Sequence, residues 1–316
     1  MPDPLQILKA AAAAALTAAV VLLLLAWPWR APNRARVSAG YVLGIGLGFF
    51  VGCWVLGTRP HWPPREDQDR LLLVLLPAVM VVELIAAVAG RFPWLVWALR
   101  LLVAAGAVPV LLYNSTYLTD LAGPGTRQWT PTQTWLVLGV LAGGLAVAWI
   151  LLALLDGRSS GRWFPLTLAI AAGGAGLTIM LSGYASGGQM GLSLAAALAG
   201  AMVASLAIAW PQPTEGALGV GVVGLFGLIV VGHFFGELAT SHALLLFLAP
   251  LLAWLGELPY VRRLRPFIRS PLRVCLTAVP VAVALLIARQ NFMVESARTS
   301  GDTNEPSIQD YMNYGK

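Results

Sequence analysis

The chain consists mainly of about ten apolar stretches, each roughly 17 to 23 residues long, which follow one another from Leu5 to Arg289 with short polar connectors between them. A helix of about 20 apolar residues is long enough to cross the roughly 30 Å hydrocarbon core of a bilayer. Composition agrees, because 58% of the residues are hydrophobic and only 11% are charged, whereas a soluble domain typically contains about 25% charged residues. The sequence therefore predicts an all-α, polytopic integral membrane protein.

Hydropathy, together with residues that typically begin or end helices, sets the expected boundaries of these helices. We expect one transmembrane domain over residues 1–289 and a polar tail over 290–316, whose low hydrophobicity predicts disorder. The predicted spans cover residues 7–27, 38–57, 71–90, 94–112, 133–155, 163–184, 190–210, 216–237, 242–258 and 272–289.

Arginine and lysine in the connectors predict the orientation. If the N-terminus is outside, the cytoplasmic connectors hold the larger share of these residues, as is typical of cytoplasmic loops. With ten spans the C-terminus is then also outside, and we expect the protein in the cell membrane. The strongest cytoplasmic marker is a cluster of five arginines, which also suits contact with anionic lipid headgroups: Arg262, Arg263, Arg265, Arg269 and Arg273. Basic residues confined to connectors do not indicate nucleic-acid binding.

Glu83 and Arg100 are the clearest ionisable residues inside the predicted spans. They lie six or seven positions on either side of the turn between two antiparallel helices, which places both roughly 10 Å from the helix ends. Equal depth on neighbouring helices predicts an intramembrane ion pair. Such a pair either fastens the helical hairpin or takes part in coupling to a proton or a substrate.

A second set of polar residues lies toward the predicted outer face. His233 and Glu237 are four positions apart on a predicted helix, and His242 begins the next one. A histidine and a carboxylate in a membrane cavity can transfer protons or bind a polar substrate, and the three residues would also be a minimal metal-ligand set. The alternative is a structural role, in which each histidine forms a hydrogen bond at its own helix end. We assign neither a metal nor a cofactor.

Tyr184 ends one predicted span and Gln189 directly precedes the next, on the same outer side. Together with His233, Glu237 and His242 they would line a polar vestibule. A hydroxyl-rich helix end entering water is the alternative explanation.

Three classes of function fit this sequence. A small-solute transporter or permease is favoured, because many helices with short connectors and a few buried ionisable groups suit an enclosed polar route. A non-catalytic membrane subunit or scaffold is the first alternative, since no site motif stands out. A membrane-embedded enzyme is the third, and the chain lacks the dense cluster of catalytic side chains that an enzyme usually needs.

Overall fold

The structure, a computed structural model, describes residues 3–26, 34–89, 92–120, 128–158, 163–208, 214–262 and 266–301. Every regular element in these ranges is helical. In chain order the elements are α1 (Pro4–Ala26), α2 (Arg34–Val55), α3 (Asp67–Arg70), η1 (Leu71–Leu75), α4 (Leu76–Val88), α5 (Pro93–Leu111), α6 (Pro131–Arg158), α7 (Phe164–Leu181), α8 (Ala185–Ala207), α9 (Glu215–Phe234), α10 (Thr240–Leu248), η2 (Ala249–Glu257), α11 (Pro259–Arg262) and α12 (Pro266–Gly301).

Within the described residues, ten helical segments are long and apolar enough to cross a membrane, judged by length and composition. They correspond one to one with the ten predicted spans. The third span is continuous through α3, η1 and α4, and the ninth through α10 and η2. The all-helical class and the number of apolar helices predicted from the sequence are therefore confirmed.

The last helix departs most from its predicted boundary. Helix α12 continues beyond Arg289 to Gly301 and covers the first part of the segment that was predicted as a disordered tail. Extending a formed helix gains one backbone hydrogen bond for each residue added, so polar residues that tolerate helix, such as Gln290 and Glu295, can prolong it. Residues 302–316, for which disorder was also predicted, lie outside the described part of the chain.

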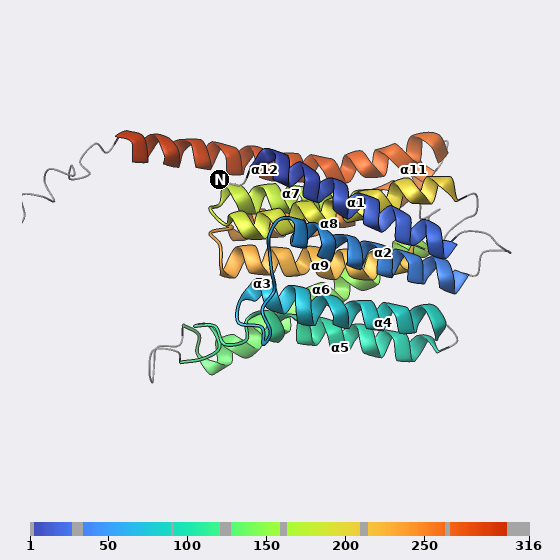
Figure 1. Ribbon diagram of the computed structural model, residues 1–316, viewed down its shortest axis with the longest axis horizontal. Coiled ribbons are helices and arrows are strands. Elements are labelled where there is room, and N and C mark those ends of the chain that lie inside the picture. Colours follow the sequence, from blue (N-terminus) through green and yellow to red (C-terminus); the bar gives the residue numbers. More distant parts are fainter. Residues whose placement is uncertain are drawn as a thin grey trace, which may run out of the picture.

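The helices form one bundle with α9 in its middle (Figure 1). Helices α1, α2, α7, α8 and α12 lie on one side of α9, and α4 and α5 lie on the other. We call the end of the bundle that holds the start of α1 the terminal end, because α12 also finishes there (Figure 1), and the other the pocket end. The α4–α5 turn and the first residue of α9 lie at the pocket end.

Glycine and alanine allow the helices around α9 to approach closely. A β-carbon built on Gly44 would lie 2.8 Å from the carbonyl oxygen of Ala18, and one built on Gly200 would lie 2.1 Å from that of Ala15. Both positions join α1 to a neighbour, α2 in the first case and α8 in the second. Small residues at such contacts are characteristic of helix packing in membranes, where backbones come close together.

Two helical segments deviate from α geometry. Residues 71–75 form a π-helical turn between α3 and α4, and residues 249–257 form a 3₁₀ helix that begins next to Pro250. A π turn is rare, and a 3₁₀ run longer than three or four residues is uncommon. Both segments lie within apolar segments of the described residues, so two of the ten candidate membrane spans contain a local change of helical pitch.

We predict that Gly200→Ala lowers the thermal midpoint of the purified protein, because the added methyl meets the backbone of Ala15 rather than a movable side chain. Overpacking of this kind costs about 1 to 3 kcal/mol. Gly106→Ala is the matched control, since a β-carbon there has no atom within 4 Å. Unfolding followed by intrinsic tryptophan fluorescence in detergent measures both, and equal midpoints would contradict the close α1–α8 contact.

Candidate functional site

Arg100 and Glu83 form a two-pronged ion pair near the pocket end. The Nε and Nη2 atoms of Arg100 each donate a hydrogen bond of 2.8 Å, to Oε1 and Oε2 of Glu83 respectively. Both residues are buried, with exposed fractions of 6% for Arg100 and 1% for Glu83. A paired geometry of this kind is what allows opposite charges to be held away from water.

Neighbouring helices shape the surroundings of this pair. A β-carbon on Gly219 of α9 would lie 2.5 Å from the Glu83 carboxyl group, so the carboxylate fits only because α9 has no side chain at that position. The Arg100 guanidinium carbon lies 5.0 Å from the centre of the Trp97 ring and 5.7 Å from that of Trp149. These aromatic faces attract the cation and reduce the cost of removing it from water.

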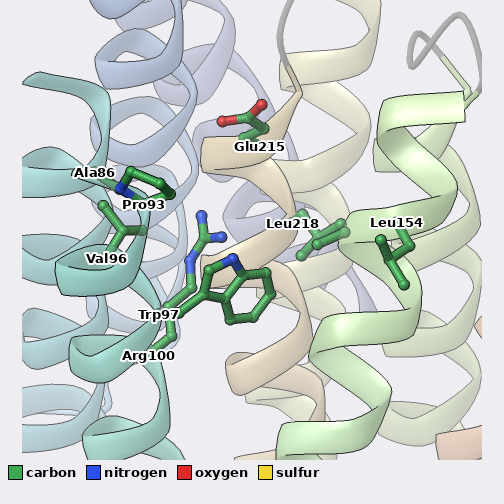
Figure 2. A pocket seen from close by; sticks show the side chains of 9 residues that line it. Ala86, Pro93, Val96, Trp97, Arg100, Leu154, Glu215 and Leu218 are labelled. Carbon is green, nitrogen blue, oxygen red and sulfur yellow. The ribbon is translucent and has the colours of Figure 1, made fainter. Parts of the chain in front are cut away.

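A pocket of about 240 Å³ opens beside Arg100. It lies between the end of α4, the start of α5, the end of α6 and the start of α9. Figure 2 shows the guanidinium of Arg100 and the ring of Trp97 facing α9, with the Glu215 carboxylate nearer the end of the bundle. The Nη1 atom of Arg100 takes no part in the bonds to Glu83. The pocket therefore presents a cation and a carboxylate at different depths.

Asp156 and Glu215 add two carboxylates that the sequence analysis did not select. Asp156, at the end of α6, is buried and accepts a hydrogen bond from the hydroxyl of Thr214, which precedes α9. Glu215 is the first residue of α9 and is exposed. Each lies one position outside a predicted apolar span, so both were treated as connector residues. Both residues lie at the end of the bundle that was predicted for Glu83 and Arg100. This shared location is the signal by which the sequence could have identified them.

Tyr184, predicted to line an outer vestibule, belongs to a hydrogen-bonded group at the terminal end. Its hydroxyl donates to Oδ2 of Asp67 at 2.7 Å and accepts from the Gln68 amide at 2.9 Å, and the same amide donates to the hydroxyl of Ser186. Burial raises the pKa of the Tyr184 hydroxyl, so it remains a donor over the physiological range. The group joins the start of α3 to the start of α8. Gln189 lies in the second turn of α8 and is half-buried.

The connector before α3 is fastened to the same region. Asp69 accepts hydrogen bonds from the backbone N–H groups of His61, Arg65 and Glu66 at 3.1 to 3.3 Å. The buried Arg70 donates to the carbonyl oxygen of Leu111 at 3.2 Å. These bonds hold the connector against the end of α5 and give the terminal end a fixed polar cover.

The predicted His233, Glu237 and His242 constellation is not assembled as the spacing suggested. Helix α9 ends at Phe234, so Glu237 lies in the following turn, is exposed, and does not share a helix face with His233. The N–H of Leu238 bonds back to the carbonyl oxygen of Gly232 and closes the helix end. Among the described residues, no group of three or more histidine, cysteine or carboxylate side chains is arranged to hold a metal ion.

The two histidines have different surroundings. Nδ1 of His233 lies 2.7 Å from the carbonyl oxygen of Leu238, a bond within its own helix end. His242 is 6% exposed, and its Nε2 atom has no hydrogen-bond partner among the described residues. His233 therefore fits the structural alternative, a histidine that forms a hydrogen bond at its own helix end.

One of the five arginines expected at lipid headgroups is engaged inside the bundle. Arg273 is buried and forms an ion pair with Glu257 at the end of η2. The side chains of the other four lie outside the described part of the structure: Arg262, Arg263, Arg265 and Arg269. Contact between this cluster and anionic lipid stays a prediction for those four residues.

No protein-family model and no curated protein matches this sequence. The geometry of the two ends of the bundle is therefore the guide to function.

A double-mutant cycle tests whether Glu83 and Arg100 act as a unit. We expect Glu83→Gln and Arg100→Gln each to cost about 3 to 5 kcal/mol of unfolding free energy, because each leaves one buried charge unpaired. The double variant should cost clearly less than the sum. Denaturant unfolding in mixed micelles measures these costs. A cost for the double variant equal to the sum of the two single costs would contradict the coupling. Glutamine is preferred to an exchange of the charges, since arginine at position 83 would press on α9 at Gly219.

Proposed function

We propose that the chain is an integral membrane protein of the cell membrane that crosses the bilayer ten times with both termini outside. Ten apolar helices of suitable length support the crossings. The distribution of arginine supports the orientation, because Arg34, Arg36 and Arg158 lie in helix ends at the pocket end, and α12 begins there with Arg269 and Arg273. The pocket end would then face the cytoplasm.

We further propose that the protein carries a small polar solute, which enters the pocket beside Arg100 from the cytoplasmic side. The observation that carries this proposal is the pocket itself. It is about 240 Å³ in volume, and Arg100 and Glu215 are among its lining residues. An anionic group on the solute would accept from Nη1 of Arg100, and a donor group would bond Glu215. A solute with an acidic group, or a small zwitterion, fits this pair of charges.

The ion pair provides a reason for a binding step to affect the helices. An unpaired arginine in an apolar bundle is costly, and Glu83 neutralises it when the pocket is empty. An anionic solute would compete with Glu83 for the guanidinium and weaken the link between α4 and α5. The π turn of η1 precedes α4 in the same span, and Pro109 interrupts α5. Such positions are where a helix bends at low cost.

Ligand-induced stabilisation tests the proposal before the solute is known. The probes are a panel of small carboxylates, phosphates and amino acids, added to purified protein during thermal unfolding. A compound present at 100 times its Kd stabilises the folded state by about 2.7 kcal/mol. We expect hits among the acidic or zwitterionic compounds, loss of their effect in Arg100→Lys and Glu215→Gln, and accumulation of the hit in proteoliposomes that contain the wild-type protein.

Glu237→Gln is the matched control for this experiment, because it makes the same change at the terminal end on an exposed carboxylate. It should behave as the wild type. A panel with no hits and no uptake would overturn the carrier proposal and favour the subunit or scaffold alternative.

Alkaline phosphatase fusions test the orientation, since this reporter needs disulfides that form only outside the cytoplasm. Fusion after Lys316 should give an active enzyme, and fusion within the connector between α6 and α7, after Ser160, should give an inactive one. The reverse pattern would place the pocket end outside.

A further inference from the structure

A larger cavity of about 560 Å³ runs along the side of the bundle between α6, α9 and the α10–η2 segment. Its lining is almost entirely apolar and includes Val140, Val147 and Leu244. His233 is the one ionisable residue among those that line it. The cavity is thus distinct in chemistry and in position from the charged pocket beside Arg100.

The three elements give the cavity a direction. Helix α6 runs away from the terminal end from Leu136 to Ala148, and α10–η2 runs the same way, while α9 runs back from Phe226 to His233. His233 and Leu136 therefore lie at the terminal end of the groove, and Phe226 and Ala148 lie toward the middle of the bundle. Twelve steps of 1.5 Å along α6 give a length of roughly 18 Å.

Helix α6 leaves this space open through two glycines. β-carbons built on Gly143 and Gly144 would have no atom within 4 Å, whereas those on Gly44 and Gly200 would meet the backbone of α1. The glycines of α6 therefore do not serve close contact between helices of this chain. No helix among the described residues fills the space that they face.

We propose that this groove binds one long hydrocarbon chain of a membrane lipid, with the polar headgroup of the lipid beside His233. The inference rests on the proposed membrane location and not on solute transport. A groove between apolar spans opens toward bilayer hydrocarbon, and its terminal end lies in the outer leaflet in the proposed orientation. Lipid acyl chains then surround the opening of the groove, and an apolar lining favours their binding.

Shape and composition favour an acyl chain. A single acyl chain is much thinner than a helix, whose diameter with side chains is about 10 to 12 Å, and it can follow the apolar residues of α6, α9 and α10 along the groove. The segment 302–316 of this chain is rich in polar and charged residues and does not match the lining. A slender apolar chain fits the groove along its length.

The terminal end of the groove suits a headgroup. The 2.7 Å contact from Nδ1 of His233 to the carbonyl oxygen of Leu238 places the proton on Nδ1, so the neutral ring has Nε2 as an acceptor. The ring of Phe234 lies 4.9 Å from that of His233, and Phe234 also packs against Tyr117 and Trp129. Tyrosine and tryptophan concentrate at the headgroup level of membranes. A headgroup with a donor, such as the ammonium of phosphatidylethanolamine, matches the imidazole acceptor.

The test uses the full-length protein in nanodiscs of phosphatidylethanolamine and phosphatidylglycerol. The probe is phosphatidylethanolamine with a photoreactive diazirine in one acyl chain. After irradiation, we expect adducts on α6 and α10 that saturate as the probe is increased. In Gly144→Leu, whose side chain would occupy the groove, this labelling should fall about tenfold. Gly106→Leu is the matched control, because its position is equally open but does not line the groove, and it should label as the wild type.

Labelling of α6 and α10 that is unchanged in Gly144→Leu would overturn the proposal. So would labelling that rises without saturation, as expected for the exposed Leu16 and Leu24 of α1. Absence of adducts on α6 and α10, together with a dimeric mass of the purified protein in detergent, would overturn the proposal and show that a second protein chain covers the groove. Arg100→Lys should leave lipid labelling intact, so failure of this inference and failure of solute transport are distinguishable.

Discussion

The whole bundle depends on how closely other helices can approach α9. Helices that pack inside a bilayer gain little from burying apolar surface, because lipid is apolar as well, and they depend on close contact instead. Helix α9 meets this condition with glycine on several faces: Gly216 approaches the backbone of Ser38 in α2, Gly221 approaches Leu168 in α7, and Gly224 approaches Leu194 in α8. One slim helix can therefore be enclosed by neighbours on all sides, and it is the most completely buried of the ten.

The small cross-section of α9 also leaves room for the charged side chains of Glu83 and Arg100. Glu83 occupies the space that a side chain at Gly219 would need, and this brings the Glu83–Arg100 pair against the central helix. Packing and electrostatics are therefore linked at one glycine. A residue with a β-carbon at position 219 would separate the helices or displace the carboxylate. The polar pocket beside Arg100 exists at the junction of four helices because α9 is narrow where the pair lies.

The sequence predicted what depends on length, hydropathy and local spacing, and missed what depends on where a helix stops. Ten apolar helices were expected, and Glu83 and Arg100 were expected at equal depth from the turn that joins their helices. The His233–Glu237 relation was wrong, because it assumed a helix through residue 237 while α9 ends at Phe234. Asp156 and Glu215 were passed over for a similar reason, since each lies just beyond an apolar stretch. The bond from Tyr184 to Asp67 joins residues far apart in the chain, and hydropathy carries no information about such partners.

The 3₁₀ geometry of η2 affects how the length of a short helical segment compares with the thickness of the hydrocarbon core of a membrane. The segment Thr240–Glu257 contains only 18 residues, which would extend roughly 27 Å as a continuous α-helix. With nine residues at about 2.0 Å per step instead, it reaches roughly 31 Å. In the proposed membrane location, the tighter coil brings the segment to the thickness of the hydrocarbon core and reduces its hydrophobic mismatch with the lipid.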